Sequence, residues 1–284
     1  MSSAANAVAN PGAELPVHQQ FTEIKTRQQR MWASGDYAAV AAQIAPVAER
    51  LVEAADLQAG WRVLDVATGT GNAALAAARS GCSVVGVDYV PGLLERGRRR
   101  AEAEGLALEL VEGDAERLPV EDAGFDTVLS VFGVMFAPDQ EKAASELVRS
   151  CRPGGTIALA NWTPSGFIGE MFRVVGRHVA PPAGLRSPLA WGTPERLREL
   201  LGGCVRSIST THRRFTFRYL SPRHFVEFFR LHYGPTLKAF EALEPERREA
   251  LAADLADLAR RSDRNGRGAL AIPAEYLEVL AVRD

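Results

Sequence analysis

Short apolar runs alternate with helical stretches between Trp61 and Trp162, and this rhythm restricts the possible folds more than any other feature of the sequence. The runs have the composition of buried strands and cover residues 62–66, 83–87, 107–111, 125–131 and 156–160. Expected helices separate most of them, over residues 72–80, 91–105 and 139–151. Because parallel neighbouring strands need a long crossover, the alternation predicts an α/β fold with a doubly wound, mostly parallel sheet covered on both faces.

The segments on either side of this region have a different pattern and divide the chain. Residues 1–16 are small and polar, so we expect a disordered lead. Residues 17–58 are interpreted as an N-terminal helical cap. Residues 59–284 would form the ligand-binding α/β domain, with substrate-side insertions at about 163–193 and 221–263.

These flanking segments carry their own helix and strand signals. Two pairs of a hydroxyl residue and Pro mark helix starts, since the hydroxyl caps the first turn and Pro lacks only an N–H that has no partner there. The stretch over residues 163–191 is rich in Pro and Gly and is expected to be irregular. Helices are expected over 19–34 and 46–55, from 193 and from 221, and over 245–261; late strands are expected over 205–217 and 275–282.

The first strand leads into a glycine-containing turn and then into a helix. Gly69 and Gly71 allow the backbone to approach a ligand closely, and the turn follows a parallel strand, where open α/β sheets bind ligands. Asp65 at the end of that strand would repel a pyrophosphate but attract a cationic amine or sulfonium. The turn therefore favours S-adenosylmethionine (SAM) over a nicotinamide dinucleotide.

Two further acidic positions follow the next two strands. Asp88 ends the second strand about twenty residues on, where a carboxylate accepts hydrogen bonds from ribose hydroxyls. Gly113, Asp114 and Ala115 follow the third strand. The Asp114 carboxylate can accept from an exocyclic amine, and the N–H of Ala115 can donate to a ring nitrogen. Together these positions predict an adenosine site, with ordinary polar turns as the alternative.

The same motifs, with residues 125–130 and 147–155, resemble those of the class I SAM-dependent methyltransferases, and specifically the small-molecule branch related to ubiquinone and menaquinone biosynthesis. The resemblance covers about a third of the chain. It implies a seven-stranded Rossmann-like methyltransferase fold with a reversed last hairpin, SAM as cofactor and S-adenosylhomocysteine (SAH) as product. Ala67 replaces a Gly of many members, and we expect little effect. The implied cofactor-binding residues, together with the predicted cap residues, are Trp32, Tyr37, Asp65, Ala67, Thr68, Gly69, Gly71, Asn72, Asp88, Tyr89, Gly113, Asp114, Ala115, Ser130 and Phe132.

Trp32 and Tyr37 lie where such proteins place a cap over the cofactor, and we expect them to exclude water from the site. Simple core packing is the alternative interpretation. Methyl transfer is an in-line displacement that mainly needs alignment and exclusion of water, so a base is useful only for a phenol or a carbon acid. His232 and Tyr233 are the preferred catalytic candidates, ahead of His18, Glu170, His178 and His224.

Aromatic residues gather in the later insertion and indicate an apolar or aromatic methyl acceptor, with methylation at oxygen or carbon. They are Phe225, Phe228, Phe229 and Phe240, and a small local core is an equally good explanation of them. Two alternatives to a methyltransferase stay open. One is a nicotinamide-dependent oxidoreductase, since Gly69 to Ala74 nearly matches G-x-G-x-x-G, and the other is a subunit that binds SAM without catalysis.

Charge and composition restrict the partners. The formal net charge is −2 and the pI about 6.3, so a nucleic-acid partner is not expected. No continuous apolar stretch is long enough to span a membrane, and no His or carboxylate cluster has metal-ligand spacing. Three widely spaced cysteines and the lack of an export signal predict a cytoplasmic protein. The expected partner is a small-molecule methyl acceptor, and a homodimer is left open.

Overall fold

The computed structural model describes residues 17–181 and 184–284, and it confirms the α/β fold. The predicted lead, residues 1–16, lies outside the described residues. The strands are β1 (Arg62–Val66), β2 (Ser83–Asp88), β3 (Glu109–Glu112), β4 (Phe125–Val131), β5 (Cys151–Trp162), β6 (Val205–Tyr219) and β7 (Leu270–Arg283). The helices are α1 (Val17–Trp32), α2 (Tyr37–Ala54), α3 (Asn72–Arg79), α4 (Pro91–Glu104), α5 (Gln140–Ser150), α6 (Phe167–His178), α7 (Pro194–Leu201), α8 (Pro222–His232), α9 (Gly234–Glu241) and α10 (Pro245–Ser262), with short 3-10 turns η1 (Val134–Phe136) and η2 (Pro188–Gly192).

Seven strands form one sheet in the order β3-β2-β1-β4-β5-β7-β6. Strands β1 to β5 pair in parallel, whereas β7 is antiparallel to both β5 and β6. This is the seven-stranded sheet with a reversed last hairpin that the resemblance implied. The strand order reverses between β1 and β4, and open sheets of this kind bind ligands at the carboxyl ends of the strands beside such a reversal.

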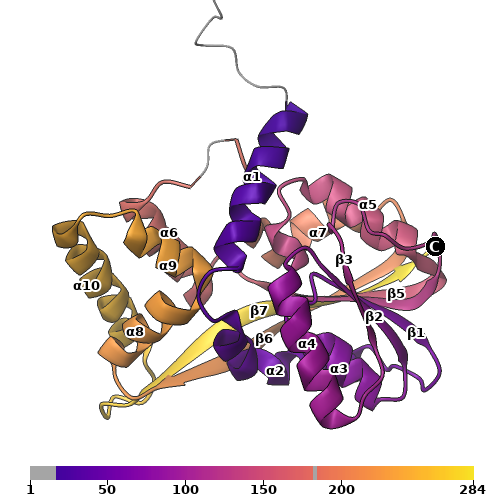
Figure 1. Cartoon of the computed structure of the whole chain (residues 1–284), viewed down its shortest axis with the longest axis horizontal. Coiled ribbons are helices and arrows are strands. Elements are labelled where there is room, and N and C mark those ends of the chain that lie inside the picture. The colour runs from indigo at the N-terminus through magenta and orange to yellow at the C-terminus, as the bar shows by residue number, and fades with distance from the viewer. Residues whose placement is uncertain (1–16, 182–183) are drawn as a thin grey trace, which may run out of the picture.

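Helices cover both faces of the sheet (Figure 1). Helices α2, α3 and α4 contact one another on one side, while α5 and α7 form a contacting pair on the other. The central strands β1 and β4 are buried at most positions on both faces, and apolar residues make up the larger part of each. Helix α1 runs across the carboxyl ends of the strands toward the helices of the insertions (Figure 1).

Two sequence-based boundaries were wrong. Helix α2 begins at Tyr37, nine residues before the expected start at residue 46, and contains Pro46. Its buried stripe includes Val40, Ile44 and Val47 at helical spacing, and this burial outweighs the hydrogen bond that Pro46 removes. The stretch expected to be irregular contains α6. Its Pro and Gly residues mostly flank the helix, and four of its apolar residues are buried: Phe167, Ile168, Met171 and Val174.

The helices of the two insertions pack against one another. Helix α10 contacts both α6 and α8, and α8 contacts α9, so these helices form one layer at the end of the long strands β6 and β7 (Figure 1). Helix α9 was not expected from the sequence. Among the described residues, no helix combines the length and apolar character that crossing a membrane would require.

Candidate functional site

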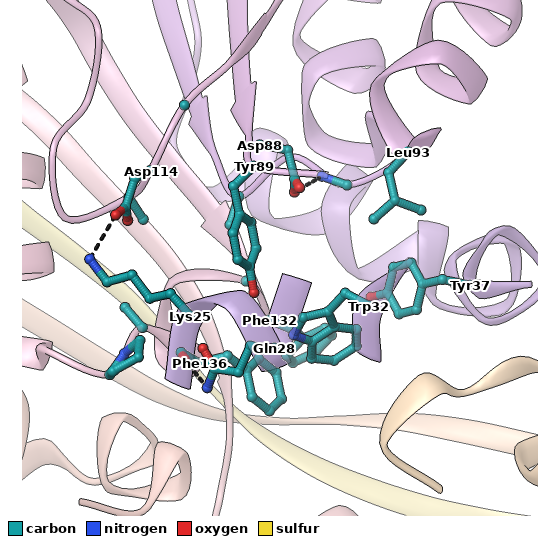
Figure 2. A pocket seen from close by; sticks show the side chains of 17 residues that line it. Lys25, Gln28, Trp32, Tyr37, Asp88, Tyr89, Leu93, Asp114, Phe132 and Phe136 are labelled. Carbon is teal, nitrogen blue, oxygen red and sulfur yellow. Dashed lines mark hydrogen bonds and ion pairs between the residues drawn. The ribbon is translucent and has the colours of Figure 1, made fainter. Parts of the chain in front are cut away.

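Three adjoining cavities open at the carboxyl ends of the strands. The largest, the main cleft, has a volume of about 680 Å³ and lies between α1 and the ends of β2, β3 and β4 (Figure 2). The glycine-loop cavity, of about 390 Å³, follows β1. The aromatic chamber, of about 350 Å³, lies beneath α1 and α8. Tyr37 lines all three cavities, so they meet at its side chain.

Asp88 anchors the main cleft at the end of β2. Its side chain is 5% exposed, and its two carboxylate oxygens accept backbone N–H groups of Gly69 and Val90, each at 2.9 Å. Burial raises the pKa of Asp88 to about 6, while these backbone hydrogen bonds act in the opposite direction. The carboxylate therefore fixes the glycine turn and still has lone pairs free to accept from a ligand in the cleft.

Asp65 has a similar place at the end of β1, beside the glycine-loop cavity. Its Oδ2 accepts hydrogen bonds from the Thr68 hydroxyl at 2.6 Å and from the N–H of Ala74 at 2.9 Å. Burial, with a smaller contribution from the nearby Asp88 charge, raises the pKa of Asp65 to about 7, while the hydrogen bonds from Thr68 and Ala74 act in the opposite direction. Gly69 has φ +57°, a left-handed conformation that places its backbone against the ring of Tyr37.

Ala67 has φ +54°, which is a left-handed conformation that costs a residue with a Cβ about 1–2 kcal/mol. The sequence comparison with Gly-bearing members led us to expect little effect of this Ala. The structure instead indicates local strain at the junction of the main cleft and the glycine-loop cavity, both of which Ala67 lines.

We predict that Ala67→Gly stabilises the protein by about 0.5–1 kcal/mol, because relief of strain exceeds the added entropy of the unfolded chain. Chemical denaturation would measure this change. Ala73→Gly in α3 is the matched control and should destabilise by about 1 kcal/mol, since Ala73 is helical. An Ala67→Gly variant no more stable than the parent would show that the conformation of Ala67 is not strained.

Helix α1 closes one side of the main cleft through polar contacts that the sequence did not reveal. The Nζ of Lys25 lies 2.7 Å from Oδ2 of Asp114 and also contacts the Glu116 carboxylate. Burial alone would lower the pKa of Lys25, but these two carboxylates hold it above its usual value. Gln28 donates to the carbonyl oxygen of Phe136 at 3.1 Å (Figure 2), and Gln29 donates to that of Tyr89. One Asp114 oxygen is thus engaged by a cation.

The aromatic chamber is almost entirely apolar. Phe132 has φ +57° and stacks on Trp162 with ring centroids 3.7 Å apart. Trp32 lies edge-on to both Tyr37 and Tyr233, with centroid distances of 5.5 and 5.6 Å. The lining residues are Trp32, Tyr37, Val40, Ile44, Phe132, Phe136, Trp162, Ile168, Phe217, Phe229 and Tyr233.

Most of the residues predicted from the sequence come together around these cavities. The main cleft is lined by Trp32, Tyr37, Ala67, Gly69, Asp88, Tyr89, Gly113, Asp114, Ala115 and Phe132. The glycine-loop cavity adds Asp65, Thr68 and Asn72. Lining residues that sequence reasoning missed include Lys25, Gln28, Leu93, Ile44, Gly133, Phe136, Trp162 and Phe217. The one available signal was Gly133, just after the fourth strand, where a Cβ would lie 2.6 Å from that of Ala67.

Three predicted site residues do not line the cavities. Gly71 is the left-handed N-cap of α3 and packs against α4. The hydroxyl of Ser130 is buried, donates to the carbonyl of Val66 at 2.7 Å and accepts from the N–H of Val134 at 3.0 Å, so it braces two strand ends. His232 packs on Phe228, with centroids 4.8 Å apart, and its Nδ1 is buried without a partner among the described residues.

Two other catalytic candidates, His178 and His224, form contacts that hold helices in place. The Nε2 of His178 lies 2.8 Å from the Asp254 carboxylate, which joins α6 to α10 away from the cavities. The Nδ1 of His224 accepts the N–H of Leu220 at the start of α8. Of the two preferred candidates, His232 and Tyr233, only Tyr233 lines a cavity, and that cavity is the aromatic chamber.

The donor and acceptor groups around the main cleft and the glycine-loop cavity suit a cationic adenosine derivative. Two buried carboxylates, Asp65 and Asp88, face this space. Lys25 is the only Lys or Arg among the described residues that line the three cavities, and it is already paired with carboxylates. A pyrophosphate would meet negative charge here, whereas a sulfonium and an ammonium group would be attracted. SAM therefore fits the residues that are present.

Comparison with known proteins agrees with this chemistry. The chain matches the methyltransferase domain family over residues 63–155. It is 42% identical over 231 residues to an uncharacterized protein of Mycobacterium tuberculosis, covering 80% of this chain and 84% of the relative. It is 36% identical over 173 residues to a demethylmenaquinone methyltransferase of Deinococcus radiodurans, covering 55% of this chain and 71% of the relative.

A solved structure shares the arrangement of strands and helices. The YcgJ protein from Bacillus subtilis has a TM-score of 0.58 and 18% sequence identity, with 83% of this chain and 97% of that chain covered. At this identity the likeness shows the fold alone, and it agrees with the seven-stranded sheet described above.

Proposed function

Because this chain belongs to the class I SAM-dependent methyltransferases and uses SAM as its cofactor, we propose that it methylates an oxygen or carbon atom of a small, apolar or aromatic acceptor bound in the aromatic chamber. The observation that carries this proposal is the shared wall between the two spaces. Trp32, Tyr37, Phe132 and Phe136 line both the main cleft and the chamber, so an acceptor in the chamber would adjoin the cofactor.

The cofactor supplies a methyl group on a sulfonium that is already electrophilic, and the protein has to hold and orient it. Asp88 would accept the ribose hydroxyls, and Asp65 and the Gly69 turn would meet the methionine end. Asp114 and the N–H of Ala115 would read the adenine, with Lys25 sharing the Asp114 carboxylate. In this proposal residues 17–58 act as the cap and residues 59–284 as the α/β domain, with its insertions supplying the acceptor side.

Two further findings support an apolar acceptor. Relatives from Deinococcus radiodurans and Thermus thermophilus are named demethylmenaquinone methyltransferases, so their named substrate is a quinone. The aromatic residues of the later insertion divide between two roles. Phe229 lines the chamber, whereas Phe225 and Phe240 are buried outside it and form local core.

We also propose a cytoplasmic location, because Cys204 is an exposed free thiol.

Calorimetric titration with SAM and SAH, followed by a methylation screen against phenols, quinones and polyketides, tests this function. We expect micromolar binding of both ligands and methylated products by mass spectrometry. Phe229→Leu should change the KM of an acceptor several-fold and leave the SAM affinity within about twofold, since Phe229 lines only the chamber. Phe240→Leu is the matched control outside the cavities.

Failure would take distinct forms. Binding of SAM without turnover of any acceptor would favour the non-catalytic subunit that the sequence left open. Binding of NADH or NADPH in place of SAM, detected by fluorescence, would favour the oxidoreductase.

A further inference from the structure

The aromatic chamber holds two phenol hydroxyls in otherwise apolar surroundings. Apart from the indole N–H groups of Trp32 and Trp162, the hydroxyls of Tyr37 and Tyr233 are the polar side-chain groups among its lining residues. Both tyrosine rings flank the same indole, that of Trp32, and Figure 2 shows the hydroxyl end of Tyr37 turned toward it. Neither hydroxyl has a hydrogen-bond partner among the described residues, so both are free to serve a ligand.

The chamber lacks a group that could remove a proton from an acceptor. Its eleven lining residues are all described, and none carries a carboxylate, an imidazole or an amine. Burial raises the pKa of Tyr37, as does the neighbouring Asp88 carboxylate, and burial followed by the proximity of Tyr37 raises the pKa of Tyr233. Both side chains therefore stay neutral at physiological pH. A neutral phenol donates a hydrogen bond and is not a base.

On the basis of the proposed function, we infer that the acceptor is an acidic phenol or enol that binds as its anion, with the hydroxyls of Tyr37 and Tyr233 donating hydrogen bonds to the anionic oxygen. This role differs from the general base that the sequence suggested for Tyr233. Two donors aimed at one buried oxygen are the arrangement by which enzymes hold an oxyanion.

The charge balance of the reaction agrees with an anionic acceptor. The acceptor loses its proton to solvent before it enters the chamber. Its oxygen, or its enolate carbon, then bonds to the methyl carbon as the carbon–sulfur bond breaks and leaves its electron pair on sulfur. An anion and a sulfonium cation thereby become an uncharged methylated product and an uncharged thioether. Because opposite charges cancel in the transition state, the low-dielectric walls of the chamber favour the reaction.

A chromogenic phenol can test the inference without turnover. The probe is para-nitrophenol, whose phenolate absorbs at longer wavelength than its phenol, bound to the protein saturated with SAH. A spectroscopic pH titration should show a lower pKa for the bound probe than for the free probe. Tyr233→Phe and Tyr37→Phe should each weaken binding of the phenolate about tenfold, the usual loss for one hydrogen bond to a charged group.

Tyr219→Phe is the matched control, because this buried tyrosine donates to Gln43 at 2.8 Å and does not line the chamber. SAH binding to each variant is checked by calorimetry, since Tyr37 also lines the cofactor side. A bound probe that stays neutral, or a phenolate affinity that neither chamber variant changes, would overturn the inference and leave the proposed function standing. A probe that fails to bind while SAH binds would also overturn the inference, whereas the proposed function is tested separately by the methylation screen.

Discussion

Asp88→Asn should weaken SAM binding about 100-fold, the largest effect that we expect from one change in the cofactor site. In our proposal the Asp88 carboxylate accepts hydrogen bonds from both ribose hydroxyls, and hydrogen bonds to a charged group contribute about 1.5–3 kcal/mol each. The same carboxylate accepts the N–H groups of Gly69 and Val90, and an amide has only one oxygen for these partners. The variant therefore loses ligand contacts and also loosens the glycine turn. Calorimetry with SAM measures the loss.

Asp126→Asn separates this effect from a general loss of a carboxylate. Asp126 also accepts a backbone N–H, that of Arg62 at 2.8 Å, but it pairs with Arg152 and does not line the cavities. This control should bind SAM like the parent protein. If Asp88→Asn bound SAM within threefold of the parent while its circular dichroism spectrum was unchanged, Asp88 would not hold the ribose.

The sheet could be predicted because its information is local. Each of the strands β1 to β5 is signalled by its own apolar run, and the crossover helices follow from the spacing between runs. The length of α2 and the existence of α6 depend instead on packing against distant segments. Pro46 and the Pro- and Gly-rich flanks of α6 are local signals against a helix, and buried apolar stripes override them.

The cofactor side of the site was predictable for the same reason, since Asp65 and Asp88 lie at the ends of strands β1 and β2, and Gly69 and Asp114 lie in the turns after β1 and β3. The acceptor side was not. The chamber combines residues of α1, α2, α6, α8, the strands β5 and β6 and the segment after β4, and Tyr37 is brought to the junction by the packing of α2 rather than by a motif. Ser130 shows the converse failure. It lies near the end of the expected strand, yet the alternation of side chains turns its hydroxyl away from the ligand and toward Val66.

Protonation of the two buried carboxyl groups should make SAM affinity depend strongly on pH. In the unliganded protein the pKa of Asp88 is about 6 and that of Asp65 about 7, both above the ordinary value of about 3.9 because of burial. Because the folded protein binds these two protons more tightly than the unfolded chain does, the stability that they contribute is fully present below about pH 4. It is lost as pH rises through about 4 to 7. A bound sulfonium, ammonium and ribose favour the ionised carboxylates, so binding expels protons and replaces the lost stability.

We expect SAM affinity to rise about 500-fold between about pH 5 and pH 7, since each proton that must leave costs about tenfold in affinity per pH unit below its pKa, about tenfold in all for Asp88 and about 50-fold for Asp65. The thermal stabilisation of the protein by SAM should grow over the same range. Calorimetry in two buffers of different ionisation enthalpy would detect the released protons directly. Asp88→Asn removes one of the titrating groups and should flatten the dependence near pH 6, whereas Asp126→Asn should not. Because only carboxylates that face the cofactor release protons on binding, proton uptake or a flat pH profile would mean that SAM does not contact Asp65 and Asp88.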